Sequence, residues 1–190
     1  MQMTLDGFIE GPKGELDWAT KEDEETWKDV FDLQKSADTL LLGRVMYPVF
    51  EKYWLAALSN PSSTKNEIEY ARLADKMQKI VFSKSLKKVE WTTTRIIQDN
   101  IAEEIRRMKR QPGKDMVLLG GAGLASTFIN LGLIDEYHLI VNPLILGGGK
   151  PLFQDVRERH TLKLIHTKTL KSGKVVLHYS EAPARNPELE

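Results

Sequence analysis

Short apolar runs alternate with amphipathic stretches along most of the chain. The runs have the length of buried strands, and the stretches between them repeat apolar residues at the spacing of one helix face. Strands are predicted at 39–42, 79–82, 116–119 and 137–141, and more weakly at 92–97. Helices are predicted around Trp27–Phe31, Tyr47–Trp54, a charged stretch ending at Lys76, Ile101–Met108 and Leu124–Leu131. Strands that alternate with helices are typical of an α/β protein with a parallel sheet.

The two ends of the chain depart from this alternation. Runs at 162–167 and 174–179 flank Lys171-Ser172-Gly173 and predict an antiparallel hairpin. Met3-Thr4-Leu5 predicts the end of a strand, followed by a loop from Asp6 to Trp18. The expected fold is a three-layer α-β-α protein with a mostly parallel central sheet and an antiparallel C-terminal hairpin. We expect one domain over residues 1–180 and an unstructured tail over 181–190.

Two helix starts carry capping signals. Thr20 precedes Asp23 by three residues, and Asn100 precedes Glu103 by the same spacing. A polar residue followed three positions later by an acidic one is typical of a helix N-terminus. We therefore expect a side-chain cap at Thr20 and a capping box at Asn100.

Composition excludes several classes of protein. The 190 residues carry 27 basic and 27 acidic side chains, so no net field attracts nucleic acid or an anionic membrane. Cysteine is absent, which excludes disulfides and thiol catalysis and fits a reducing compartment. No apolar run approaches the ~20 residues that a membrane-spanning helix needs. We expect a cytoplasmic protein without nucleic-acid or membrane partners.

The four histidines give no metal signal along the chain. No pair of them has the spacing of ligands on one helix, and three lie in strand patterns. We therefore expect structural or surface roles and no metal site. The histidines are His138, His160, His166 and His178.

Three predicted strands end in small, polar or basic residues. These ends are Gly43-Arg44, Ser83-Lys84 and Gly120-Gly121, and the last continues through Ala122-Gly123 into a predicted helix. Each group alone is also compatible with a structural role in packing, a helix start or a turn. Together they indicate a ligand site, because ligands of open α/β sheets bind beyond the carboxyl ends of the strands. Glycines before a helix favour a phosphate, and Arg or Lys nearby suits the 2′-phosphate of NADPH.

Other nucleotide and catalytic motifs do not fit the chain. A dinucleotide fingerprint started at Gly121 and Gly123 has Ser126 in place of its third glycine. A phosphate-binding P-loop at Gly149-Lys150 lacks its first glycine and has Pro151 where Ser or Thr must hold Mg²⁺. The G-x-S-x-G elbow of serine hydrolases is absent.

The strand-end groups, in this order, resemble the dihydrofolate reductase fold. The resemblance is closer still to the reductase domain at the C-terminus of bifunctional riboflavin-biosynthesis (RibD) proteins, in particular to stand-alone, single-domain members. It runs from Met3 to about Tyr179. The segments that carry it are 4–9 (TLDGFI), 41–44 (LLGR), 119–124 (LGGAGL) and 132–136 (GLIDE), with Pro143 and Leu146-Gly147.

This resemblance implies NADPH-dependent hydride transfer to a C=N or C=O bond of a small pterin-, pyrimidine- or carbonyl-type substrate. The activity is related to that of 5-amino-6-(5-phosphoribosylamino)uracil reductase. It implies a 2′-phosphate site at Gly43, Arg44, Ser83 and Lys84, and a pyrophosphate site at Gly120, Gly121, Ala122, Gly123 and Leu124. The backbone near Leu5 to Ile9 is expected beside the nicotinamide, with Trp18 at the substrate. Such proteins commonly form homodimers.

Two positions depart from the riboflavin-pathway reductases. Leu119 replaces a glutamate before the double glycine, and Phe8 replaces a basic residue after Leu-Asp-Gly. Apolar side chains here leave a ribityl-phosphate ligand's polar atoms unpaired, at ~1–3 kcal/mol each. Phe8, Trp18 and Leu119 are therefore the expected substrate residues of a different substrate class. Only Met1 to Met3 precede the first motif, so its strand is expected to be short or to begin upstream.

The proton donor of such a reductase is expected among three acids. Asp6 and Asp17 flank the first loop, and Asp23 lies five residues after Trp18, where dihydrofolate reductases carry their acid. A donor carboxyl needs a raised pKa, whereas an acid in the first turn of a helix commonly just complements the helix dipole. The alternative function is a nucleotide- or small-ligand-binding protein without catalysis on the same fold.

Overall fold

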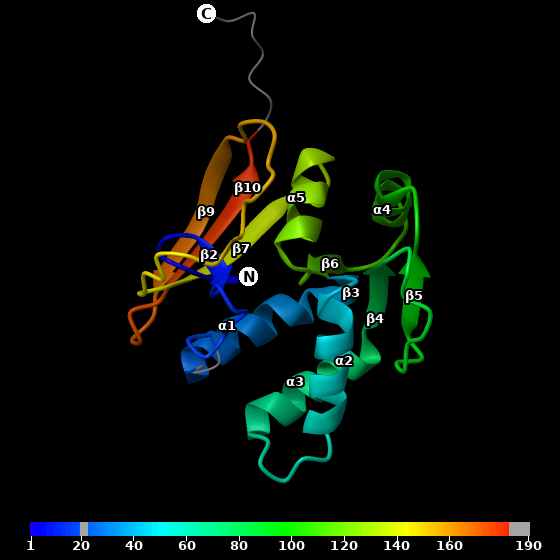
Figure 1. Ribbon diagram of the computed structural model, residues 1–190, viewed down its shortest axis with the longest axis horizontal. Coiled ribbons are helices and arrows are strands. Elements are labelled where there is room, and N and C mark those ends of the chain that lie inside the picture. Colours follow the sequence, from blue (N-terminus) through cyan, green and yellow to red (C-terminus); the bar gives the residue numbers. More distant parts are fainter. Residues whose placement is uncertain (20–22, 183–190) are drawn as a thin grey trace, which may run out of the picture. The chain divides into compact units, whose positions relative to one another are not determined.

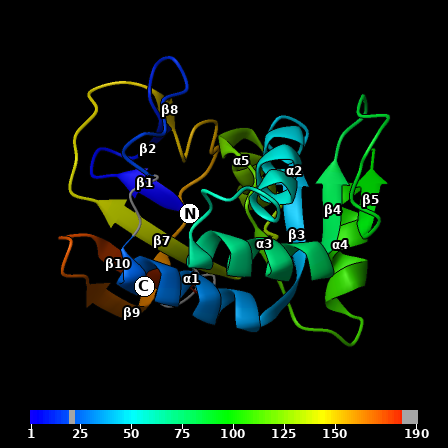
Figure 2. The same cartoon turned by 90° about the horizontal axis from the view of Figure 1, so that it is seen from below.

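The computed structural model describes residues 1–19 and 23–182, which form two compact units. The central unit is Glu22–Ala125, and the terminal unit combines Met1–Lys21 with Ser126–Glu190. Figures 1 and 2 show the elements of each unit. No helix within the described ranges is long and apolar enough to cross a membrane.

The central unit contains a parallel sheet of four strands in the order β5-β4-β3-β6. All three pairings between neighbours are parallel, and Figure 2 shows β3, β4 and β5 running in the same direction. The parallel sheet predicted from the apolar runs is therefore confirmed. Its strands are β3 (Ala37–Gly43), β4 (Gln78–Phe82), β5 (Thr94–Ile97) and β6 (Asp115–Leu118).

Helix α1 (Glu24–Lys35) precedes β3, and the other helices within this unit connect its parallel strands. The chain moves one way across the sheet from β3 to β4 and the opposite way from β5 to β6. Since such crossovers are right-handed, the two connections cover opposite faces of the sheet, as Figure 1 shows for α2 and α3 against α4. The helices are α1 (Glu24–Lys35), α2 (Met46–Ala57), α3 (Lys65–Lys76) and α4 (Ile101–Lys109).

The core of the central unit is rich in aromatic side chains. Leu40 and Leu42 of β3 are fully buried and share one face of the strand, where they join a cluster with Phe50 and Tyr70. The rings of Phe50 and Tyr70 meet edge-on at 6.4 Å, a favoured arrangement of aromatic pairs. The stripes predicted at Trp27–Phe31 and Tyr47–Trp54 therefore contribute to this cluster, through residues such as Trp27, Phe31 and Trp54.

A buried carboxylate organises the loop before β5. Glu51 of α2 accepts hydrogen bonds from the backbone N–H groups of Glu90 (2.7 Å) and Trp91 (2.9 Å) and from the Tyr47 hydroxyl. Burial is the main cause that raises the pKa of Tyr47, and its bond to Glu51 adds to the shift. These hydrogen bonds join α2 to a loop about forty residues further along the chain. They also offset the cost of burying the carboxylate, which would be high if it had no hydrogen-bond partner.

Lys79 of β4 is a fully buried cation in the same unit. Its ammonium donates to the Asp75 carbonyl and to the Thr93 hydroxyl, both at 2.8 Å, and lies 4.2 Å from the centre of the Trp91 ring. Burial lowers the pKa of Lys79 to about 8, although Asp75 and Glu51 act in the opposite direction.

The terminal unit contains a mixed sheet in the order β1-β7-β10-β9. The β1 strand runs parallel to β7, while β10 pairs antiparallel with both β7 and β9, which confirms the predicted C-terminal hairpin. Each unit thus contains one four-stranded sheet, and the described strands also form a separate two-stranded pair. The strands here are β1 (Gln2–Thr4), β7 (Glu136–Asn142), β9 (Leu162–Thr169) and β10 (Val175–Glu181).

The prediction of an unbroken loop from Asp6 to Trp18 is wrong. The segment contains β2 (Phe8–Glu10), which pairs antiparallel with β8 (Lys150–Pro151). Strands this short have too few residues to display an alternating pattern, so they cannot be recognised from the sequence. The last helix, α5 (Ala122–Asn130), begins in the central unit and continues into the terminal one.

Helix capping differs from the prediction. Asn100 precedes α4 in a left-handed conformation (φ 56°), and its side chain makes no capping bond, because a capping residue needs an extended backbone. The complete capping box lies instead at Thr64 and Glu67, before α3. Asp23 caps α1, whereas the predicted cap Thr20 lies outside the described residues.

Lys79 makes stability depend on pH. The folded pKa of about 8 lies below the ordinary 10.5, so the charged form disfavours folding and this penalty is relieved as pH rises from 8 to 10.5. We expect the free energy of unfolding of the wild type, minus that of Lys79→Met, to increase over this range in urea titrations. Lys87→Met, which removes an exposed lysine, is the matched control; a difference that stays constant with pH for Lys79→Met would contradict the assignment.

Candidate functional site

The carboxyl ends of β3, β4 and β6 meet at one edge of the parallel sheet. Gly43 lies opposite Phe82, and Leu41 lies opposite Leu118. Because all three strands are parallel, the residues that follow them leave the sheet at the same edge, where ligands of open α/β sheets bind. The structure thus brings together the strand-end groups Gly43-Arg44, Ser83-Lys84 and Gly120-Gly121.

Gly120 is required by packing within the fold. A Cβ at this position would lie 2.7 Å from Leu124 Cδ2, 3.1 Å from Leu124 Cβ and 3.3 Å from the Gly43 backbone nitrogen. Leu124 itself packs over Gly43, with its Cβ 3.7 Å from the position a side chain would take there. Gly120 therefore lets the ends of β3 and β6 approach under the first turn of α5, whereas a methyl group at Gly43 would make only ordinary van der Waals contact.

Gly121 and Gly123 behave differently. A Cβ built at either residue meets no other heavy atom within 4 Å, so packing within the chain does not require these glycines. The Gly121 carbonyl accepts the N–H groups of Leu124 (3.0 Å) and Ala125 (3.1 Å) and so opens helix α5. Open space before a helix N-terminus fits a pyrophosphate, which the helix dipole favours and which side chains here would obstruct.

Arg44 follows β3 with an exposed side chain. Its guanidinium forms no hydrogen bond or ion pair with the residues that the structure describes. A guanidinium without an internal partner can give a phosphomonoester two parallel hydrogen bonds. Of the basic residues predicted for the 2′-phosphate, Arg44 is the one that the fold leaves available.

Ser83 and Lys84 already have partners inside the chain. The Ser83 hydroxyl accepts the backbone N–H groups of Ser85 (3.2 Å) and Leu86 (2.8 Å), which shapes the turn after β4. The Lys84 ammonium lies 2.6 Å from an Asp99 carboxylate oxygen, and this hydrogen bond raises the pKa of Lys84. Both residues lie at the expected edge, but a phosphate would have to share them with these interactions.

Asp6 is a structural acceptor. Its carboxylate accepts the Thr4 hydroxyl at 2.6 Å and the backbone N–H groups of Leu146 (3.2 Å) and Gly147 (2.8 Å). The bond from Thr4 is the main cause that lowers the pKa of Asp6. A proton donor near neutral pH needs a raised pKa, so these contacts argue against Asp6 in that role.

The other two candidate acids differ in environment. Asp23 Oδ1 accepts the Thr26 backbone N–H at 2.7 Å and caps α1, the structural role that the position before a helix favours. Asp17 is exposed in a turn of the terminal unit. Neither arrangement by itself assigns a catalytic role, which stays a prediction for both.

The three predicted substrate residues have distinct surroundings. The indole N–H of Trp18 is buried and has no hydrogen-bond partner among the described residues, so it retains a donor for a ligand. Phe8 is half-buried, and its backbone N–H donates to the Thr4 hydroxyl at 3.0 Å. Leu119 packs against the aromatic cluster of the central unit.

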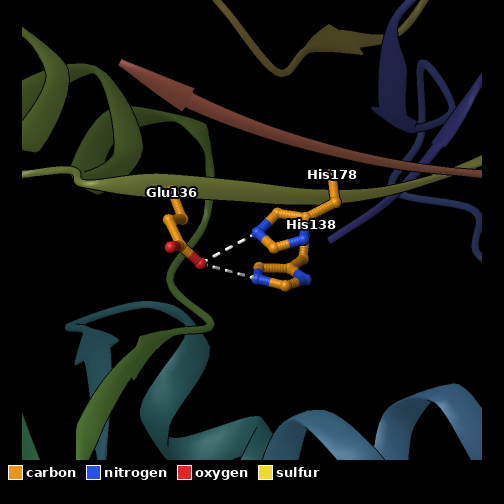
Figure 3. Close-up of side chains that lie close together, drawn as sticks. All are labelled: Glu136, His138 and His178. Atoms are coloured by element: carbon orange, nitrogen blue, oxygen red, sulfur yellow. Dashed lines mark hydrogen bonds and ion pairs between the residues drawn. The ribbon is translucent and has the colours of Figure 1, made fainter. Parts of the chain in front are cut away.

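A cluster that the sequence did not predict lies in the terminal unit. Glu136, His138 and His178 place their carboxylate and imidazole atoms within 4.8 Å of one another (Figure 3). The two histidines are 40 positions apart in the chain and meet because β7 and β10 are paired. The i, i+2 spacing of Glu136 and His138 places these two on one face of a strand, but only the strand register could have indicated that His178 joins them.

The chain has a dihydrofolate reductase-like fold. A putative riboflavin biosynthesis protein from Shewanella sp. PV-4 superposes with a TM-score of 0.72 at 18% identity, covering 96% of this chain and 97% of that one. Dihydrofolate reductase from Enterococcus faecalis, complexed with NADP(H), superposes with a TM-score of 0.60 at 14% identity, covering 96% and 94%. These similarities confirm the expected fold.

The chain belongs to the RibD C-terminal domain family, whose sequence profile matches residues 1–176. The uncharacterized protein YyaP of Bacillus subtilis (strain 168) is 40% identical over 179 residues, which cover 94% of this chain and 91% of YyaP. The match to the family profile confirms the resemblance drawn from the strand-end motifs.

The different roles of the adjacent glycines can be tested by stability. We expect Gly120→Ala to lower the free energy of unfolding by about 1–3 kcal/mol, because its methyl group would overlap Leu124 and the Gly43 backbone. Gly121→Ala is the matched control, with open space around the added methyl and a change within about 0.5 kcal/mol. Equal losses in chemical denaturation would contradict this distinction.

Proposed function

We propose that the protein is an NADPH-dependent reductase that acts on a C=N or C=O bond of a small substrate. The observation that carries the proposal is the edge of the central sheet, where Gly121 and Gly123 leave open space at the start of α5 and Arg44 has no hydrogen-bond or ion-pair partner among the described residues. Glycines that packing does not need and a free guanidinium are the two features that a pyrophosphate and a 2′-phosphate require. Membership of the RibD C-terminal domain family and a fold shared with a dihydrofolate reductase support the same reading.

When bound, NADPH supplies a hydride to the carbon of the double bond and leaves as NADP⁺, while a proton goes to the nitrogen or oxygen. In the proposal, Gly120 to Leu124 hold the pyrophosphate through the start of α5, and Arg44 holds the 2′-phosphate. Ser83 and Lys84 border that phosphate while keeping their internal bonds. The buried indole N–H of Trp18 donates to an acceptor atom of the substrate.

The substrate proposed here lacks a ribityl phosphate. Leu119 and Phe8 replace the acidic and basic residues of riboflavin-pathway reductases, and neither can pair with hydroxyl or phosphate oxygens. Unpaired polar atoms at a buried site cost about 1–3 kcal/mol each. A compact pterin-, pyrimidine- or carbonyl-type compound fits better than 5-amino-6-(5-phosphoribosylamino)uracil. The same proposal includes a homodimer, as the family resemblance implies, and a cytoplasmic location, which the absence of cysteine favours.

A second candidate function is nucleotide or small-ligand binding without turnover. It is favoured by Asp6, because the hydrogen bond from Thr4 lowers the pKa of this candidate donor. A general acid needs a shift in the opposite direction. In the reductase, the proton would then have to come from Asp17 or Asp23, or from water.

Turnover separates the two functions. NADPH oxidation is followed by absorbance with pterins, pyrimidines and carbonyl compounds as acceptors, and we expect consumption with at least one of them. NADPH binding without oxidation across the whole series would favour the binding protein. Both proposals would fail if neither NADPH nor NADH stabilised the chain, because ligand at ~100 times its Kd adds ~2.7 kcal/mol.

Arg44 tests the phosphate site directly. We expect Arg44→Ala to weaken NADPH at least about tenfold, since hydrogen bonds to charged groups contribute ~1.5–3 kcal/mol, while NADH affinity changes little. Arg110→Ala, which removes an exposed arginine at the end of α4, is the control. Calorimetric titration measures both cofactors; an equal loss for NADPH and NADH would rule out a 2′-phosphate role.

A further inference from the structure

The terminal unit holds a compact cluster of one carboxylate and two imidazoles. Glu136 Oε2 lies 2.8 Å from His178 Nε2 and 3.4 Å from His138 Nε2, and the two rings stack with centroids 3.8 Å apart. Figure 3 shows the Nε2 atoms of both rings directed at the same carboxylate oxygen. Three potential metal ligands therefore already converge on one point.

The strands explain why these side chains meet. His138 of β7 lies directly opposite His178 of β10, which places both on the same face of the sheet. Glu136 is two residues before His138, and side chains two apart on a strand share a face. The cluster is accessible from solvent: the side chains of Glu136, His138 and His178 are 51%, 34% and 21% exposed.

We propose that Glu136, His138 and His178 form a binding site for a late first-row divalent metal ion, with Zn²⁺ as the best-fitting ion. Two imidazole nitrogens and one carboxylate oxygen are a donor set that Zn²⁺ accepts, with bonds of about 2.0–2.2 Å. Three protein ligands leave a fourth tetrahedral position for water or a small anion. Mg²⁺ and Ca²⁺ are disfavoured, because both prefer sites made of oxygen ligands.

The side chains of the cluster already face one another. Both imidazole Nε2 atoms lie within 3.4 Å of Glu136 Oε2, and a bound cation would replace these contacts with metal–ligand bonds.

A bound metal would link β7 to β10. Each strand contributes at least one ligand, so coordination would add a cross-strand connection within the mixed sheet. A ligand that binds the folded chain more tightly than the unfolded one raises the unfolding temperature. The site therefore predicts metal-dependent stability in addition to binding.

The experiment titrates tag-free, metal-stripped protein with Zn²⁺ by calorimetry and counts bound zinc by elemental analysis. We expect one zinc per chain and an affinity at least about tenfold weaker, or ~1.4 kcal/mol, in His138→Asn and His178→Asn. His160→Asn is the matched control, because His160 pairs with the Glu181 carboxylate at 3.5 Å outside the cluster. An absence of saturable binding by the wild type, or unchanged affinity in both cluster variants, would overturn the proposal.

Two measurements on the wild-type chain test the site without any variant, so their outcome does not depend on whether the variants fold. Zinc should shift the imidazole NMR signals of His138 and His178 and leave those of His160 in place. It should also raise the Tm of the wild type. Binding that shifts only other histidines would equally refute the site, and neither readout depends on the proposed reductase activity.

Discussion

The parallel pairing of β3 with β4 on one side and with β6 on the other is the constraint on which the central unit depends. The register sets which residues of β3 face the aromatic cluster, since a slip of one position would turn Leu40 and Leu42 to the opposite face. The same register brings three strand ends to one edge. Core packing and the candidate cofactor site are therefore consequences of a single arrangement of backbone hydrogen bonds.

At that edge, some groups are engaged in contacts within the fold, and others are available to a ligand. Leu124 leaves no room for a side chain at Gly120, and Lys84 forms an ion pair with Asp99. Gly121 has open space around it, and Arg44 forms no hydrogen bond or ion pair with the described residues. A rigid, closely packed base that carries unused phosphate-binding groups is what a preorganised nucleotide site requires. The proposed reductase function rests on this contrast more than on the presence of glycines.

The sequence predictions succeeded mainly where a feature depends on residues that are close together in the chain. Strand ends such as Gly43 and helix stripes such as that of α2 were predictable, because hydrophobic period and glycine placement are local signals. The capping box predicted at Asn100 failed because its backbone is left-handed, a conformation set by the loop around it. The β2–β8 pair was missed because two or three residues display no period. Opposed strands, not chain spacing, brought His138 to His178.

The order of the longer strands and helices, the family and the groups at the strand ends were determined by the sequence alone. Each of these depends on residues close together in the chain. Only the tertiary structure decided that Asp6 is occupied by Thr4 and two backbone donors, that Lys79 is buried beside Trp91, and that an imidazole pair faces Glu136. The physical reason is that hydrogen bonds, burial and ion pairing involve residues tens of positions apart, whose meeting is set by strand register and packing.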